Sequence, residues 1–199
     1  MEVRQTYASA ALNATGIASA VAWAAGGYAL TAAGAADGTA HLITITGIAA
    51  TNHSAKTFTV TGTDENDNAV TQAIAGPNGA VAVTTTKYFK TVTSVTVSAT
   101  TGADTFNIGW TAASVGAWVL PKLNTVANIN IGIGCSVPTG TPTYAIRYTY
   151  DAVSWFTHAT ITGKSAAFDG TITIPCKAFQ LIFAAAGTVS MTVIQPELY

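Results

Sequence analysis

Potential metal ligands cluster at one place in this sequence, the acidic stretch Asp64-Glu65-Asn66-Asp67-Asn68. Calcium is bound by several oxygen ligands from closely spaced carboxylates, amides and carbonyls. The first, third and fifth side chains of the stretch match the start of a calcium loop. However, Ala69 stands where such a loop needs glycine, and Ala75 stands where it needs an acid. Asp and Asn are also preferred in hairpin turns, because they tolerate left-handed backbone conformations. We therefore predict a plain turn here, with a bound cation as the alternative.

Other motifs of catalytic or metal chemistry have little support. The histidines His41, His53 and His158 occur in unrelated contexts, outside any HxxxH or CxxC pattern, so no zinc site is predicted. There is no GxSxG motif, and Gly132-Ile133-Gly134 lacks the surroundings of a phosphate-binding loop. The chain has only 9 acids, several of them in predicted turns, which argues against a glycosidase pair. We predict that the protein is not an enzyme and has no catalytic residue, no metal and no cofactor.

The aromatic residues have two interpretations. Those considered are Trp23, Trp110, Trp118, Trp155, Tyr144, Tyr148 and Tyr150. Exposed aromatic rings stack on sugars in carbohydrate-binding modules, whereas buried rings contribute much of the packing energy of cores and subunit interfaces. The three tyrosines alternate along one predicted strand and share a face with Ile146. We favour a core or interface position for them, with sugar binding as the alternative.

The two cysteines, Cys135 and Cys176, are too few for a disulfide framework. We expect two buried thiols in a protein made in the cytosol. A disulfide within the second half of the chain, or one between subunits, remains open.

The elements that must position these residues are predicted to be strands. Residues 56–62 alternate threonine with Phe58 and Val60, a pattern typical of a half-buried strand. Residues 91–98 place Val92 on one face but Val95 on the other, which predicts a bulge near Thr93-Ser94. Further strands are predicted at 40–46, 69–75, 80–86, 105–110, 143–150, 178–184 and 188–195. Turn residues separate them, and no long helix is predicted.

This pattern predicts an all-β fold. The residue pattern of the sequence changes near residue 115, where a second set of predicted strands begins. We expect two small β-sandwich domains, Ig-like or jelly-roll-like, at residues 23–114 and 115–199. An extended N-terminal arm, residues 1–22, is expected to precede them.

Composition limits the classes of partner. Only 9% of the residues are charged, against about 25% in an ordinary soluble domain, while the mean hydropathy is +0.39. Hydroxyls and methyls lose water at far lower cost than ions do, so we expect other protein to cover much of the surface. The net charge is -1 with no basic cluster, which argues against nucleic acid as a partner. No 18-residue apolar stretch and no signal-peptide pattern occur, so we predict no membrane insertion and no secretory leader.

Two groups of segments carry a resemblance to a known class of protein. The first group comprises residues 40–46, 58–64, 74–78, 88–95 and 108–110, and the second comprises residues 142–151, 155–158 and 193–195. Both resemble β-rich virion structural proteins of tailed bacteriophages, which are encoded among head and tail genes. The likeness covers roughly residues 23–114 and 135–196, and it is a pattern of strands and turns without a catalytic signature. It implies a virion component that is assembled in the host cytoplasm.

The functional expectation joins this resemblance to the composition. The first hypothesis is a capsid decoration (cement) protein, a homo-oligomer and specifically a trimer, which binds the major capsid protein and stabilises its lattice. Val3, Tyr7 and Ala11 of the arm are expected to contact the lattice. Trp118, Tyr148 and Trp155 are expected to pack subunits together. The alternatives are a neck, connector or tail protein of the same virion, which would contact neighbouring head or tail proteins, and a carbohydrate-binding host-adhesion module.

Overall fold

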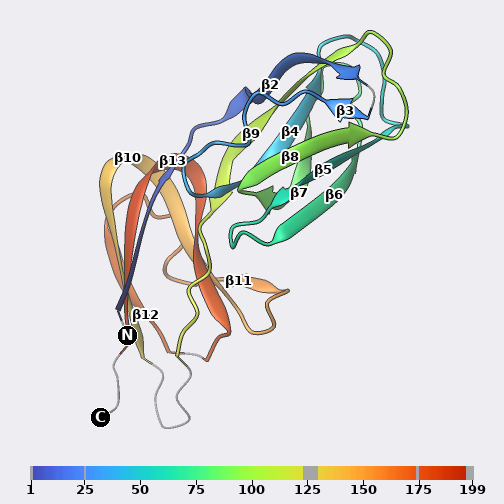
Figure 1. Cartoon of the computed structure of the whole chain (residues 1–199). Coiled ribbons are helices and arrows are strands. Elements are labelled where there is room, and N and C mark those ends of the chain that lie inside the picture. The colour runs from blue at the N-terminus through green and yellow to red at the C-terminus, as the bar shows by residue number, and fades with distance from the viewer. Residues whose placement is uncertain (1, 25, 123–129, 174, 196–199) are drawn as a thin grey trace. The chain divides into compact units, whose positions relative to one another are not determined.

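The chain is all-β in a computed structural model, which describes residues 2–24, 26–122, 130–173 and 175–195 (Figure 1). Within these ranges the chain forms strands β1 to β13 and no helix, and hydrogen bonds join the strands into two sheets. The all-β prediction is therefore confirmed. Contacts divide the chain into two compact units. We call residues 11–114 the N-terminal unit, and residues 1–10 together with 115–199 the C-terminal unit.

Residues 1–22 do not form the separate arm that we expected. Strand β1 (Glu2–Ser9) pairs antiparallel along its whole length with β13 (Ala178–Ile194), from Glu2 opposite Ile194 to Ser9 opposite Gly187. Strand β2 (Asn13–Ala24) pairs with β9 (Thr105–Val115) in the N-terminal unit. Exposed and half-buried residues alternate along β1, and this alternation explains the pairing with β13. It places Val3 and Tyr7 on the face that packs against the core of the C-terminal unit.

Two long strands that bend over build the C-terminal unit. Strand β10 (Ile131–Thr149) pairs antiparallel with β13, and the register is interrupted between Ser136 and Tyr144. At the bend Gly140 lies opposite Gly187, and both adopt positive φ angles, of 77° and 146°. Only glycine reaches such conformations readily, so these two positions allow both strands to arch over (Figure 1).

The bend produces two layers around a shared core. The first layer joins β1, the late half of β13, the early half of β10 and β12 (Phe168–Ile172). The second layer joins the early half of β13, the late half of β10 and β11 (Trp155–Thr157). Both layers contribute to one buried cluster, which includes Ile131, Ile133, Cys135, Tyr144, Ile146, Phe179, Leu181, Phe183, Val189, Met191 and Val193.

A short extended segment continues the second layer. Gly116 donates its backbone N–H to the carbonyl of Leu181, and Val119 exchanges backbone hydrogen bonds with Phe179. Val119 is buried in the core, so Trp118 points to the opposite, outer side of this layer.

The N-terminal unit has its own core. A three-stranded sheet orders β6 (Ala69–Ala75), β5 (Thr57–Thr63) and β8 (Thr91–Val97). The remaining strands of this unit are β2, β3 (Gly27–Tyr28), β4 (Ala40–Gly47), β7 (Val83–Phe89) and β9. Ring contacts of 5.3–5.8 Å join Tyr28, Phe58 and Phe106 in the centre of the core.

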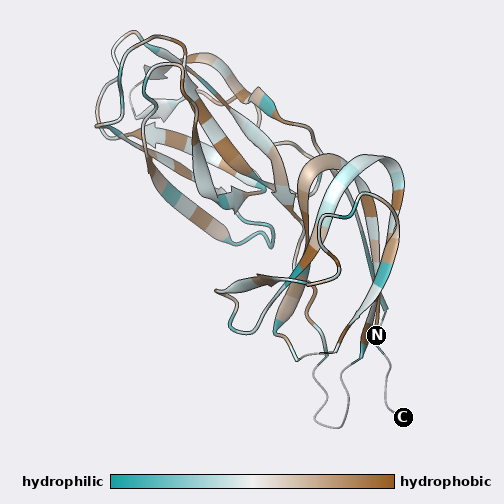
Figure 2. Cartoon of the chain, turned by 180° about the vertical axis from the view of Figure 1, so that it is seen from behind, coloured by the Kyte–Doolittle hydropathy of each residue, from teal (hydrophilic) through white to brown (hydrophobic). Residues whose placement is uncertain are grey.

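Several strand predictions agree closely with this unit. The register of β5 against β8 shifts between Ser94 and Val92, which leaves Thr93 as the extra residue and confirms the predicted bulge. Figure 2 shows hydrophobic and hydrophilic positions interspersed along the strands, as half-buried strands require.

Candidate binding surfaces

The acidic stretch forms a turn that its own side chains stabilise. One carboxylate oxygen of Asp64 accepts the backbone N–H groups of Asn66 (2.8 Å) and Asn68 (2.9 Å). Asp67 has a positive φ of 65° and forms an ion pair with Lys90 at 2.8 Å. The prediction of a hairpin turn is confirmed, because these residues connect β5 to β6. Among the described residues no three His, Cys, Asp or Glu side chains gather in a way that could hold a metal ion.

Two histidines hold loops of the N-terminal unit in place. The ring of His41 lies 2.7 Å from the carboxylate of Asp37 and 2.8 Å from the carbonyl of Thr111. The ring of His53 lies 2.8 Å from the carboxylate of Asp104 and accepts a hydrogen bond of 3.1 Å from Lys56. Both imidazoles are buried, and their hydrogen bonds connect separate segments of the N-terminal unit.

The side chains best placed to bind a partner belong to the hairpin of β10 and β11. We call residues 147–157 the aromatic hairpin. Tyr148 lies opposite Phe156 across the two strands, and Tyr150 contacts both rings at 5.6 and 5.7 Å. These rings continue the core-facing side of β10 beyond the buried core. Tyr150 is 51% exposed, Phe156 is 47% exposed, and Val153 at the tip is 80% exposed.

Asp151 fixes the tip of the aromatic hairpin. Its carboxylate accepts the backbone N–H groups of Val153 and Ser154, both at 2.7 Å, and the hydroxyl of Thr149 at 3.0 Å. The two backbone hydrogen bonds, followed by those from side chains, hold the pKa of Asp151 well below its usual range. The tip therefore presents apolar side chains in a defined conformation, and its one acid is already hydrogen-bonded.

The outer side of the hairpin is anchored to the sheet by stacked side chains. Trp118 and Trp155 meet edge to face, with ring centroids 5.3 Å apart. The guanidinium of Arg147 lies 4.7 Å from the centre of the Trp155 ring and donates to Gln180 at 2.7 Å. Gln180 in turn donates to the carbonyl of Gly116. The cation–π contact and this hydrogen-bond chain fix the hairpin to the neighbouring strands of the same layer.

The structure brings together two of the six residues predicted to form interfaces, Trp118 and Trp155, on the outer side of the aromatic hairpin. Tyr148 lies on the other, core-facing side of the hairpin, stacked on Phe156. Val3 and Tyr7 lie in β1 as half-buried core residues, and the Tyr7 hydroxyl accepts the backbone N–H of Ala117 at 2.9 Å. The remaining predicted residue, Ala11, is exposed, and its carbonyl accepts the indole N–H of Trp110 at 3.0 Å.

The sequence prediction missed Val153 and Phe156 as exposed residues of the aromatic hairpin, and it missed the half-buried Arg147 beside Trp155. A signal was present, because aromatic residues stand on both sides of Asp151, as they do in a hairpin with paired rings. Without the pairing register, however, the sequence did not show that Phe156 lies opposite Tyr148.

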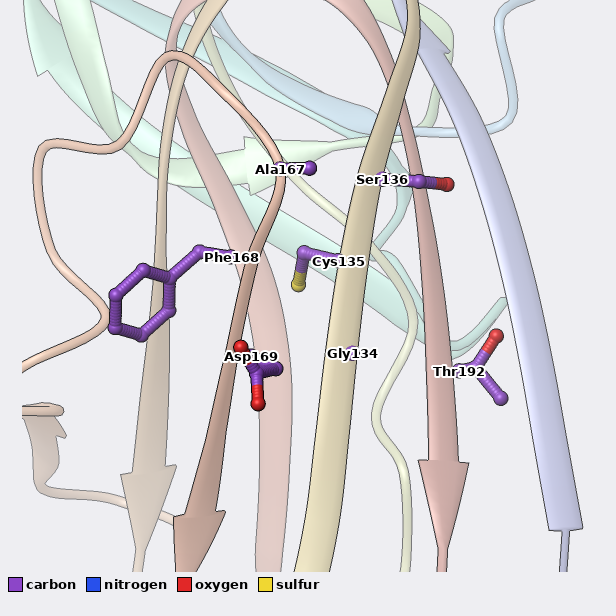
Figure 3. Close-up of a pocket in the computed structure, with 7 residues that line it drawn as sticks. All are labelled: Gly134, Cys135, Ser136, Ala167, Phe168, Asp169 and Thr192. Atoms are coloured by element: carbon purple, nitrogen blue, oxygen red, sulfur yellow. The ribbon is translucent and has the colours of Figure 1, made fainter.

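A second surface is a shallow depression on the outer face of the first layer of the C-terminal unit. Gly132 and Gly134 of β10 form its floor, Asp169 and Thr171 of β12 lie on one side, and Thr192 and Ile194 of β13 lie on the other. We call these six residues the glycine trough. Figure 3 shows Asp169 and Thr192 on either side of Gly134. Two adjoining hollows of about 380 and 290 Å³ occupy it.

The missing side chains explain the trough. An added Cβ at Gly134 would meet no atom within 4 Å, and one at Gly132 would approach only the Ile194 carbonyl, at 3.7 Å. Cys135 points to the core side of the same strand, and burial raises the pKa of its thiol to about 11. Cys135 and Cys176 are both buried and not disulfide-bonded, so neither thiol is exposed in the trough.

Comparison with known proteins finds no matching family model and no matching curated protein. In the part of the chain that the structure describes, no helix is long and apolar enough to span a membrane. The aromatic hairpin and the glycine trough can bind a partner by packing and hydrogen bonding.

Proposed function

We propose that this protein is a non-catalytic structural subunit of a tailed-bacteriophage virion, and specifically a capsid decoration protein built from two small β-sandwich domains. It attaches to copies of itself and to the major capsid protein, and thereby stabilises the shell. The observation that carries the proposal is the exposed aromatic hairpin in a chain with only 9% charged residues.

The chemistry of the hairpin supports attachment to protein. Tyr150, Val153 and Phe156 expose apolar surface on a tip whose conformation Asp151 fixes. Aromatic residues and arginine are enriched at the centres of protein interfaces, where a rigid ring adds contact area at little entropic cost. Since few charges surround these rings, covering them requires little desolvation of ions.

Binding to capsids tests this proposal. The full chain is mixed with capsids of the virus that encodes it, and the mixture is sedimented. We expect saturable binding at a fixed ratio to the major capsid protein, because a lattice offers a fixed number of equivalent sites. A Tyr150→Ser/Phe156→Ser variant should lose at least tenfold in affinity.

The matched control is Val81→Ser, which removes a similarly exposed apolar side chain (67% exposed) from the N-terminal unit. This variant should bind as the wild type does. Failure of the wild-type chain to co-sediment, or unchanged binding by the double variant, would contradict attachment through the aromatic hairpin.

A carbohydrate-binding adhesion module is a second candidate, favoured by one observation. Tyr150 and Phe156 are each about half exposed, so a sugar face could stack on their rings. A carbohydrate-binding module should bind cell-surface glycans as the isolated protein, whereas a decoration protein should bind only capsids. A glycan array separates the two candidates.

A neck or tail position is distinguished by copy number. Six or twelve chains per particle would favour it over decoration of the capsid.

A further inference from the structure

We propose that the aromatic hairpin of one copy of this chain docks in the glycine trough of a second copy, so that the subunits join head to tail. The inference rests on the proposed function, because it names the partner of the surface that carries that function.

The shapes of the two surfaces are complementary. The hairpin tip projects Val153 beyond the rings of Tyr150 and Phe156, all of them about half or more exposed. The trough lacks side chains along its floor at Gly132 and Gly134, and its hollows are large enough to accept ring-sized side chains. A flat strand face with ordinary side chains would hold such a tip away from the sheet.

The polar groups of the two surfaces also match. Asp169, on the wall of the trough, is exposed, and its carboxylate has no hydrogen-bond or ion-pair partner among the residues that the structure describes. Tyr150 carries a hydroxyl donor on the hairpin, and partial desolvation, together with the neighbouring Tyr148, raises its pKa. The hydroxyl therefore stays protonated at neutral pH, and it can donate a charge-assisted hydrogen bond to the Asp169 carboxylate of the neighbouring copy.

The position of the two surfaces determines the type of assembly. The hairpin belongs to the second layer of the C-terminal unit, and the trough lies on the outer face of the first layer. One surface of a copy therefore contacts a different surface of the next copy, which is a heterologous contact. Such contacts produce a closed ring when the rotation between neighbours divides a full turn, and an open filament when it does not.

Reciprocal complementation tests this contact. In one variant, Gly134→Gln, a long side chain fills the trough while the hairpin stays intact. In the other, Tyr150→Ser/Phe156→Ser, the hairpin is removed while the trough stays intact. Light scattering should give a mass of several chains for the wild type and of one chain for each variant alone. An equimolar mixture of the two variants should give a mass of two chains, because one intact hairpin then meets one intact trough.

Two controls exclude misfolding and a general effect of the added side chain. Gly134→Gln should melt within a few degrees of the wild type, because a Cβ at this position meets no atom within 4 Å. Ala8→Gln places the same side chain on an exposed position of β1, in the same layer but outside the trough, and should leave the oligomer intact.

Three outcomes would overturn the inference. They are a wild-type chain that stays monomeric, a Gly134→Gln variant with the mass of the wild type, and a mixture that stays monomeric. Each differs from failure of the proposed function, which is measured separately as loss of capsid binding. Two results together would separate the proposals: Gly134→Gln keeps the wild-type oligomer, and the hairpin variant loses capsid binding. The trough contact would then be wrong, whereas the proposed function would still hold.

Discussion

At the scale of single residues, the ionisable groups of this protein mainly stabilise its structure. The Tyr144 hydroxyl donates to the carbonyl of Ala166 at 2.8 Å, and burial raises its pKa to about 12. Burial likewise raises the pKa of Cys135 to about 11. Since both groups are neutral in the folded core, their charged forms favour unfolding.

These two shifts predict loss of stability in alkaline solution. The unfolded chain releases the protons at the ordinary pKa values, 9.0 for Cys135 and 10.0 for Tyr144, whereas the folded chain holds them to about 11 and 12. The free energy of unfolding is therefore at its full value below pH 9 and decreases as the pH rises from 9 to 12. Urea unfolding at pH 8, 9, 10 and 11 measures the slope.

Cys135→Ala provides the control for this experiment. It removes one of the two groups, so the decrease between pH 9 and 11 should become shallower, whatever the variant's stability at pH 8. A wild-type free energy of unfolding that stays constant up to pH 11 would show that the two side chains are not held neutral by the core.

At the scale of elements, alternation in the sequence predicted the short-range strands well. It identified β5 and β6 with their connecting turn, and the bulge at Thr93. In these cases the pairing partners lie close in sequence, so turn residues and period-two alternation are sufficient. The aromatic strand 143–150 was identified in the same way.

The long-range elements could not be predicted from local pattern. Pro138, Gly140 and Pro142 are residue types typical of turns, but β10 continues through them and bends, because its partner β13 bends at the same place. Strand β1 was missed since it pairs with residues near the other end of the chain. The glycine trough was missed as well, because Gly132 and Gly134 form a floor only after β12 and β13 are placed beside them.

The bend itself yields a prediction. A Cβ at Gly187 would lie 2.7 Å from the Cδ of Pro142, and the φ angle of +146° is strained for any L-residue. Gly187→Ala should therefore cost roughly 2–4 kcal/mol of unfolding free energy, from steric overlap and backbone strain. Denaturant unfolding measures the loss.

Gly134→Ala is the matched control, because it adds a methyl group to a glycine in β10 where no atom lies within 4 Å. Its free energy of unfolding should stay within about 0.5 kcal/mol of the wild type. Equal effects of the two substitutions would mean that the bend does not depend on glycine at position 187.

At the scale of the whole molecule, the N-terminal unit is an insertion in the sequence of the C-terminal unit. The chain leaves the C-terminal unit after residue 10 and returns to it at residue 115. Residues 11–114 have their own buried cluster, whereas the C-terminal unit combines residues 1–10 with residues 115–199. Strand β1 covers the edge of β13, and Val3 and Tyr7 pack on the core there.

This connectivity predicts the effect of removing residues 1–10. The truncated chain should lose stability in the C-terminal unit, because β13 loses a strand partner and two half-buried side chains. The N-terminal unit should unfold as it does in the full chain. Hydrogen exchange resolved along the sequence should show faster exchange in β13 and unchanged exchange in β5. Faster exchange in β5 as well would contradict the independence of the two cores.

The central claim is that this protein is a structural part of a virion, and the most direct test is its copy number in purified particles. Particles of the virus that encodes the chain are separated on a density gradient and washed in high salt, and quantitative mass spectrometry compares the chain with the major capsid protein. The decoration proposal predicts that the two proteins co-purify in a constant ratio, with many copies of this chain per particle. A chain that is abundant in the infected-cell lysate but missing from the washed particles would contradict it.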